Sequence, residues 1–342
     1  FQILTPKTID IALIARGLAA ATVVWWHTGG YAVSTTTGSL LTTPGRTAVW
    51  LFFTLSGYLM AYGFLSGKYK FDGHSLRKFF FNRWIRIYPL FALVLVASYV
   101  NHRAAGQPIP ITWRLIFREL FHLQWVHDYT LNSVFWTLGV EVIFYLAIPC
   151  LVWIQAKWCD VHIGATIAYG GLLLATISFT SLFPVYRGDY RDLFGNLVHF
   201  QCGIMACTWR PHILKLKSRY FEWLLAIAAG LFLVVSNRIY HTNSTDYFFR
   251  DGIVLVNALG FSVLSIHMLM EARRITEVSP VWKILHSLGV LSYGSYAWHG
   301  ALIIFPILAG NSLATFVLTY LLAYTTYVLV ERPIQRWRTL QR

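Results

Sequence analysis

The sequence predicts an all-α, polytopic membrane protein with about ten transmembrane helices and both termini in the cytoplasm. The first observation is composition: 56% of the 342 residues are hydrophobic, 12% are charged, and the mean hydropathy is +0.54. A soluble domain of this size is more polar. The second is that apolar windows of about 18 or more residues recur along the chain, which is the length a helix needs to cross a bilayer. The third is the uneven placement of Lys and Arg around these windows.

The apolar windows define the expected spans and the domain organisation. The window at 193–209 is the weakest, because it is short and contains His199 and Gln201. The longest connection, 101–132, is too short for a separate soluble domain. We therefore expect a single integral-membrane domain over residues 1–342. The expected spans are 9–30, 45–66, 84–100, 133–154, 161–182, 193–209, 220–237, 250–270, 285–308 and 311–330.

The positions of the basic residues indicate the orientation. With both termini inside, 19 of the 28 Lys and Arg lie on the inner side and 8 on the outer side, and Arg16 lies within the first window. This is the positive-inside pattern. Attraction to anionic lipid on the cytoplasmic leaflet accounts for a net charge of +14 without any nucleic acid. We expect membrane lipids, and no nucleic acid, among the partners.

Arg16 and His27 are the most informative pair in the first window, IDIALIARGLAAATVVWWHTGG. Their separation is about three helical turns, so both project from one face, about 16 Å apart. A charged guanidinium within a membrane costs at least about 2.5–3.5 kcal/mol unless it faces a protein interior or a wet cavity. Arginine suits the phosphates of a donor entering from the cytoplasm, and histidine suits a general base. The alternative for His27 is an ordinary histidine at the membrane interface.

The segment 67–86, GKYKFDGHSLRKFFFNRWIR, contains six Lys or Arg. The positive-inside rule alone explains most of this charge. Arg83 and Arg86 differ, because they lie three residues apart where we expect a helix to begin, next to the apolar run IRIYPLF. For these two, binding of a phosphate-bearing group and anchoring at the membrane boundary remain equal alternatives.

Three further motifs place polar groups in apolar windows. Glu141 lies in FWTLGVEVIFYL, where a carboxylate must be paired, protonated or hydrated; a salt bridge to Arg16 is one alternative. Tyr296 and His299 share a helix face in SYGSYAWHG, where a buried, hydrogen-bonded histidine is the simpler interpretation. In LFFTLSGYLM, the small residues at 56 and 57 favour close helix packing.

Taken together, these motifs resemble the membrane-bound acyltransferase 3 family, whose members are integral-membrane enzymes that acylate bacterial surface glycans. The similarity extends in order over nearly the whole chain. Many members have an Asp three residues before the first-helix arginine, whereas this chain has Leu13 there and Asp10 a turn away. The matching residues are Arg16 and His27; Phe52–Met60; Arg83, Arg86, Ile87 and Pro89; Trp136, Leu138, Glu141, Phe144, Tyr145 and Leu146; Ser295, Tyr296 and His299; and Glu331 and Pro333.

The resemblance implies transfer of an acyl group, most often acetyl, from cytoplasmic acyl-CoA to a hydroxyl of a surface or exported glycan. The implied location is the bacterial inner (plasma) membrane, and the implied type is the stand-alone one without an SGNH hydrolase domain. Acetyl-CoA would be a donor substrate, with a glycan or lipid-linked glycan as acceptor and no permanently bound cofactor or metal. The implied roles are general base for His27, CoA phosphate binding for Arg16, Arg83 and Arg86, orientation of Arg16 for Glu141, and acceptor or cavity positions for Ser56, Trp136, Tyr145, Tyr296 and His299.

Two other classes of function compete with the enzyme. A secondary transporter or lipid flippase would use the buried Arg, Glu and His as an ion pathway. The sequence shows no pair of repeats with interrupted helices, which weighs against this class. Binding of acyl-CoA discriminates the two, since only a transferase should be stabilised by it. A non-catalytic subunit of a polysaccharide export complex would leave the spacing of Arg16 and His27 unexplained.

Overall fold

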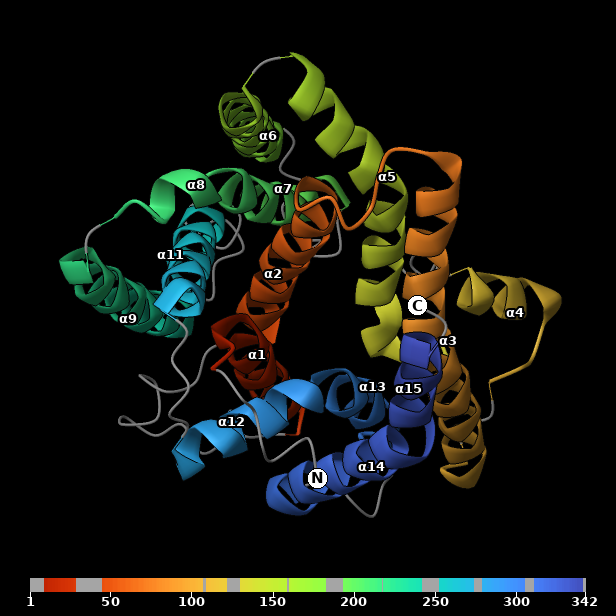
Figure 1. Cartoon of the computed structure of the whole chain (residues 1–342). Coiled ribbons are helices and arrows are strands. Elements are labelled where there is room, and N and C mark those ends of the chain that lie inside the picture. Colours follow the sequence, from red (N-terminus) through yellow and green to blue (C-terminus); the bar gives the residue numbers. More distant parts are fainter. Residues whose placement is uncertain are drawn as a thin grey trace.

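The structure is a computed structural model that describes residues 9–28, 45–106, 109–121, 130–158, 160–182, 193–216, 218–241, 252–273, 279–304 and 311–340. Every regular element in these ranges is helical (Figure 1). The α-helices are α1 (Ile11–His27), α2 (Gly45–Leu65), α3 (Gly73–Ala104), α4 (Trp113–Leu120), α5 (Trp136–Trp158), α6 (Val161–Leu182), α7 (Leu193–Thr208), α8 (Arg210–Ile213), α9 (Ser218–His241), α11 (Ile253–Arg273), α12 (Pro280–Val290), α13 (Ser292–Leu302), α14 (Ser312–Thr326) and α15 (Arg332–Leu340). A 3₁₀ turn, η3 (Ser133–Phe135), precedes α5, and a π-helical turn, η7 (Tyr327–Glu331), joins α14 to α15.

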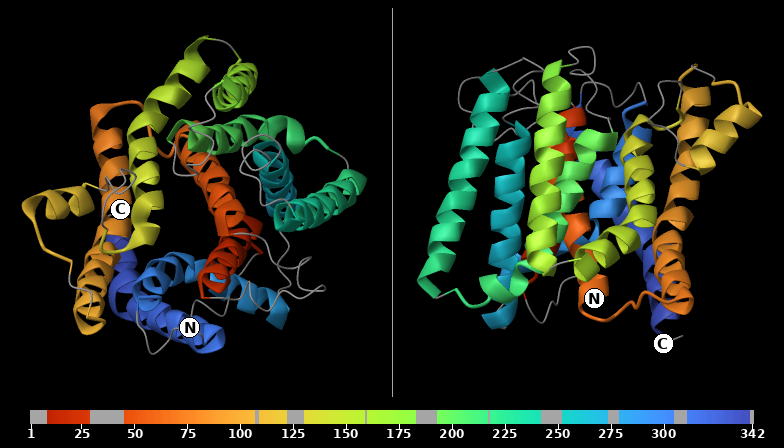
Figure 2. Two further views of the ribbon diagram at one scale, coloured as in Figure 1. Left: turned by 180° about the vertical axis from the view of Figure 1, so that it is seen from behind. Right: turned by 90° about the horizontal axis from the view of Figure 1, so that it is seen from above.

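The long helices run side by side between two ends of a bundle (Figure 2, right). Among the described residues, six helical segments are long and apolar enough to cross a membrane, and α1 is a shorter apolar helix. The chain is therefore a polytopic membrane protein, while the expected count of ten stays a prediction. The end of α15, the link from α2 to α3 and α8 share one end of the bundle, here termed the C-terminal end. The basic residues of these segments lead us to expect this end in the cytoplasm.

The expected start of the third helix was wrong. The sequence placed it near Arg83, but α3 begins at Gly73, so Arg83 and Arg86 lie well inside the helix. The Asp72 side chain caps it by accepting a hydrogen bond of 2.8 Å from the Ser75 backbone N–H. Hydropathy missed these first turns because their residues are charged and polar, although they are compatible with a helix.

The expected span at 285–308 is also wrong as a single helix, because α12 ends at Val290 and α13 begins at Ser292. At this break α12 lies directly against α1: a Cβ atom at Gly17 would overlap the Gly289 backbone nitrogen, and a Cβ at Gly289 would overlap the Leu13 carbonyl oxygen. Only paired glycines allow backbones to approach so closely. An interrupted helix is therefore present, but a single break is not the pair of repeats with interrupted helices that a transporter would show.

Helix α2 lies at the centre of the bundle and packs most closely on α7. A Cβ at Gly57 would overlap the Phe200 carbonyl oxygen, and a Cβ at Gly203 would overlap the Thr54 carbonyl oxygen. These two glycines let the α2 and α7 backbones touch. The packing interpretation of the small residues in LFFTLSGYLM is confirmed for Gly57.

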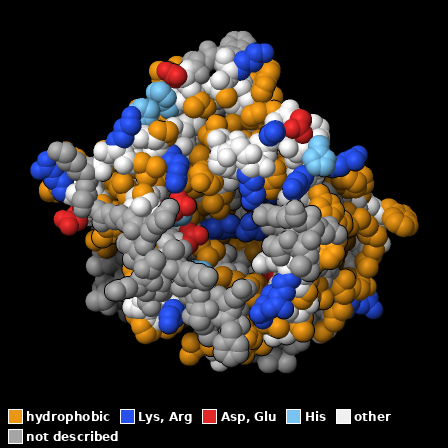
Figure 3. Space-filling model, in the orientation of Figure 1, with side chains coloured by type: hydrophobic (Ala, Val, Ile, Leu, Met, Phe, Trp, Pro, Cys, Tyr) orange, Lys and Arg blue, Asp and Glu red, His pale blue; other side chains and the backbone are white. Residues whose placement is uncertain are grey.

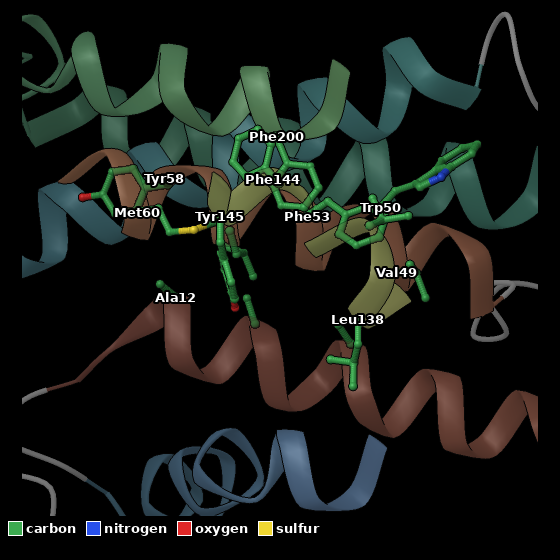
Figure 4. Packing of buried hydrophobic residues seen from close by; sticks show 14 of the residues in the cluster. Ala12, Val49, Trp50, Phe53, Tyr58, Met60, Leu138, Phe144, Tyr145 and Phe200 are labelled. Carbon is green, nitrogen blue, oxygen red and sulfur yellow. The ribbon is translucent and has the colours of Figure 1, made fainter. Parts of the chain in front are cut away.

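Aromatic rings fill the space beside this contact, as Figure 4 shows. Phe200 stacks on Phe144 and on Phe53, with ring centroids 3.8 Å and 4.7 Å apart. The three rings come from α7, α5 and α2 and are all nearly inaccessible to solvent. Such offset stacks add to the burial of apolar area. They hold α5, and with it Glu141, at a fixed position beside α2.

Candidate active site

Two adjoining cavities lie between α1, α2, α3, α5 and α13. The first, of about 50 Å³, is termed the tyrosine cavity, and the second, of about 20 Å³, the arginine cavity. They share Arg16, Ser56, Leu138, Glu141 and Tyr293, so they lie on opposite sides of the same side chains. The tyrosine cavity is further lined by Val49, Phe52, Phe53, Thr137, Ser292 and Tyr296, and the arginine cavity by Leu59, Arg83, Arg86, Ile87 and Tyr145.

Three guanidinium groups from two helices line the arginine cavity. The Cζ atom of Arg16 lies 5.9 Å from the centre of the Phe52 ring, and its buried Nε has no hydrogen-bond partner. Arg83 lies over the Tyr145 ring, with its Cζ 5.4 Å from the ring centre. Arg86 is exposed. Three cations around one cavity, one with an unused buried donor, make a strong site for an anion.

Figure 3 shows one face of the molecule, on which Lys and Arg side chains gather around a central hollow. Most of the surrounding surface is apolar, as expected for a membrane protein. Among the described residues, no group of three or more His, Cys, Asp or Glu side chains is arranged to hold a metal ion.

Glu141 is hydrogen-bonded to two hydroxyl groups at this cavity. Its Oε1 accepts a hydrogen bond of 2.6 Å from the Tyr145 hydroxyl and one of 3.1 Å from the Ser56 hydroxyl. No ion pair within 4.0 Å joins it to Arg16 in the part of the chain that is described. The direct salt bridge considered from the sequence is therefore not observed. The carboxylate instead fixes two hydroxyl groups beside the arginine and offsets part of the local positive charge.

His27 and His299 lie in direct contact at the other end of α1. The His27 Nδ1 is 3.3 Å from the His299 Nε2, and the rings are stacked with centroids 5.2 Å apart. His299 is fully buried, whereas His27 is exposed. The pair thus joins a histidine open to an incoming group to one that is held inside the protein. The sequence did not predict this contact.

Tyr296 links the histidine pair to the tyrosine cavity. Its ring lies edge-on to His299, with centroids 5.3 Å apart. Its hydroxyl donates to the Val134 carbonyl oxygen and accepts from Thr137, each at 3.0 Å. Arg16 and His27 therefore both face α13, one through the cavity and the other through His299. This is the shared helix face that their spacing predicts.

Two aromatic residues differ from expectation. Trp136 is buried with its ring edge-on to Phe53, 6.3 Å between centroids, and it lines neither cavity. Tyr293 was missed, although it lines both cavities and its hydroxyl donates to the Ile87 carbonyl oxygen at 2.8 Å. Its position three residues before Tyr296, on the same helix face, is the signal that would have identified it.

Comparison with known proteins identifies the class of enzyme. The chain is 27% identical to the acyltransferase MdmB of Streptomyces mycarofaciens over 208 residues, which is 56% of this chain and 48% of the relative. It is 22% identical to the peptidoglycan O-acetyltransferase OatA of Listeria monocytogenes over 324 residues, 85% of this chain and 51% of the relative. The chain thus spans about half the length of these curated relatives. No solved structure matches it. The model of the acyltransferase domain matches residues 11–330, and the chain therefore belongs to the acyltransferase 3 family of membrane acyltransferases.

Proposed function

We propose that this protein transfers an acetyl group from acetyl-CoA to a hydroxyl of a cell-envelope glycan. The main supporting observation is that Arg16, Arg83 and Arg86 line one cavity. Tyr296, which lines the adjoining tyrosine cavity, contacts His299 of the histidine pair. Phosphates are the most strongly anionic part of an acyl-CoA donor, and arginine binds them by charge-assisted, bidentate hydrogen bonds. In the proposed complex the three arginines bind the phosphates, and the neutral, extended arm of the donor follows the line from Arg16 towards Tyr296, which the two small cavities mark.

In this mechanism His27 is the general base. If its Nδ1–H donates to the His299 Nε2, the His27 Nε2 carries a free lone pair for the acceptor hydroxyl. As the hydroxyl oxygen attacks the thioester carbonyl, its proton passes to the His27 Nε2, the C–O bond forms and the C–S bond breaks. The CoA thiolate leaves and takes up that proton. His299 is a positioning residue, because it acts through His27.

The glycan acceptor is proposed from the relatives and from the membrane setting. One relative is named a peptidoglycan O-acetyltransferase, and a hydroxyl of an envelope glycan or lipid-linked glycan is the corresponding acceptor here. With the C-terminal end of the bundle in the cytoplasm of a bacterial plasma membrane, the donor enters where nucleotides are present. The exposed His27 then lies towards the opposite side, where the glycan is exported.

The test is acetyl transfer by purified protein in detergent, with acetyl-CoA as donor and envelope glycan as acceptor. His27→Ala is expected to lower the rate by about 100-fold or more, measured as CoA thiol release and as acetylated glycan by mass spectrometry. The control is His74→Ala, which removes an exposed histidine at the start of α3 and should keep full activity. Full transfer by a folded His27→Ala protein would contradict the mechanism.

A binding measurement tests the donor independently of the acceptor. Acetyl-CoA should raise the thermal unfolding midpoint of the wild-type protein, because a ligand that binds only the folded state stabilises it. Desulfo-CoA, which retains the phosphates, should do the same. The absence of any shift at millimolar concentration of either compound would count against acyl-CoA as donor.

A further inference from the structure

A third and larger cavity opens beside the arginine cavity, at the junction of α3, α13 and η7. Its volume is about 400 Å³, and it is termed the Glu331 cavity. It shares Arg86 and Tyr293 with the arginine cavity, so the two adjoin. Its other polar residues are Ser292, Tyr327, Glu331 and Gln335. Neither the proposed mechanism nor the positions of the histidines uses this space.

Glu331 owes its position to the π-helical turn. The backbone N–H of Arg332 bonds to the carbonyl of Tyr327, which widens the helix by one residue. Pro333 favours this, because it has no N–H and its ring crowds the preceding turn. Such π-bulges frequently occur at functional sites. The wide turn places Glu331 on the wall of the cavity.

The carboxylate of Glu331 is not satisfied within the protein. Its Oε1 is buried and has no hydrogen-bond partner. Although Arg86 lines the same cavity, no ion pair within 4.0 Å joins the two side chains in the described part of the chain. An unpaired buried acceptor is costly, so a group that donates hydrogen bonds is the natural occupant of this position.

The two charged residues of the cavity select for a ligand with two different ends. Arg86 attracts a phosphate, whereas the carboxylate of Glu331 repels phosphate and accepts only from N–H or O–H groups. A phosphorylated nucleoside has both kinds of group, because its exocyclic amine and its remaining ribose hydroxyl are neutral donors. The sizes of the cavities agree with this, because the largest lies at Glu331 and the two smaller ones adjoin it through Arg86 and Tyr293.

From these observations we infer that the Glu331 cavity binds the nucleoside end of the donor, with Glu331 accepting a hydrogen bond from it and Arg86 contacting the adjoining phosphates. The inference rests on the proposed function, since it concerns the same donor. It assigns Glu331 a role in donor recognition and none in the chemical step.

The experiment compares two donors: acetyl-CoA and acetyl-phosphopantetheine, which lacks the nucleoside. Glu331→Ala is expected to raise the KM for acetyl-CoA about tenfold at unchanged kcat, because one hydrogen bond to a charged acceptor is lost. The KM for the short donor should stay within about twofold of wild type. Glu222→Ala, which removes an exposed carboxylate of α9, is the control and should change neither value.

The possible outcomes separate the two proposals. If Glu331→Ala raises both KM values equally, or neither, the inference is wrong while the proposed function stands. If the wild-type protein transfers from neither donor, the proposed function fails. Should Glu331→Ala not fold, Glu331→Gln keeps the side-chain volume and one acceptor oxygen, and a rise of about threefold for acetyl-CoA alone is expected.

A binding assay supplies a readout without turnover. Adenosine 3′,5′-bisphosphate, the nucleoside end of the donor alone, should raise the thermal unfolding midpoint of the wild-type and Glu222→Ala proteins. The shift should be lost in Glu331→Ala. An equal shift in Glu331→Ala would overturn the assignment of Glu331.

Discussion

The two faces of α2 differ in what they contact: one packs on the backbone of α7 and the other lines the cavities. Gly57 brings the α2 backbone against the Phe200 carbonyl on α7, with no space for even a methyl group. The preceding residue, Ser56, points about 100° away around the helix, lines both cavities and donates to Glu141. Adjacent residues of α2 therefore belong to two different faces, one packed against α7 without water and the other lining the polar cavities.

The difference between these faces lies in what each can tolerate. The α2–α7 face is made of backbone contacts, which cannot relax around an added side chain. The cavity face lies opposite polar atoms that no protein group satisfies, such as the Nε of Arg16 on α1. Changes on the first face should act on folding, and changes on the second should act on catalysis and binding.

The largest expected effect comes from adding a side chain in the contact between α2 and α7. Gly203→Leu should destabilise the protein by about 3 kcal/mol or more, because its side chain would displace the Thr54 backbone. Thermal unfolding and gel filtration in detergent measure this. Gly171→Leu on α6, where a Cβ meets nothing within 4 Å, is the matched control. A Gly203→Leu protein with the wild-type unfolding midpoint would show that α2 and α7 are not so tightly packed.

On the polar side, loss of the buried histidine should have the next largest effect. His299→Ala leaves the His27 Nδ1 without its partner, so kcat should fall about tenfold or more while the KM for acetyl-CoA stays unchanged. His299→Gln retains an acceptor near the same position and should recover part of kcat. Steady-state kinetics at several pH values provide the measurement. A rise in KM with normal kcat would instead place His299 in donor binding.

Neutralising one arginine of the cavity should weaken donor binding. Arg83→Gln is expected to raise the KM for acetyl-CoA about tenfold, with a smaller difference at high salt. Arg77→Gln, an exposed residue of the same helix, should change KM by less than about twofold, because it does not line the cavity and its charge is screened by solvent. Equal effects of the two variants would mean that general basic charge, and not the cavity, attracts the donor.

The cavity face also contributes to stability, by less than the α2–α7 contact, through the hydroxyl groups on Glu141. Ser56→Ala should lower the free energy of unfolding by about 0.5–1.5 kcal/mol. Tyr145→Phe should cost about 1.5–3 kcal/mol, since its 2.6 Å hydrogen bond to the carboxylate is shorter. Denaturant unfolding of both variants under the same conditions shows which substitution lowers the free energy of unfolding more. The reverse order would show that Ser56 is the main partner of the carboxylate.

Much of the membrane character and part of the site could be predicted from the sequence. Hydropathy identified the apolar helices, because a bilayer imposes one length and composition on every span. The periodicity of a single helix was enough to place Arg16 and His27 on one face. The Ser56-Gly57 step was correctly linked to helix packing through Gly57.

What could not be predicted depends on contacts between distant parts of the chain. His27 and His299 are far apart in sequence, and no local pattern reports that their rings stack. The early start of α3 was hidden because a hydropathy window excludes charged turns that are still helical. The break at Leu291 was hidden for the opposite reason, since an interrupted helix and a continuous one can be equally apolar.

The contact between Gly17 and Gly289 sets the alignment of parts that lie far from it. It holds α1 against the end of α12, one residue after Arg16. From this contact α1 continues to His27 and α13 continues to His299. Because α1 and α13 diverge from this contact, a small change in the angle between them produces a larger change in the distance between His27 and His299. A methyl group at either glycine would thus part the imidazoles while touching neither of them.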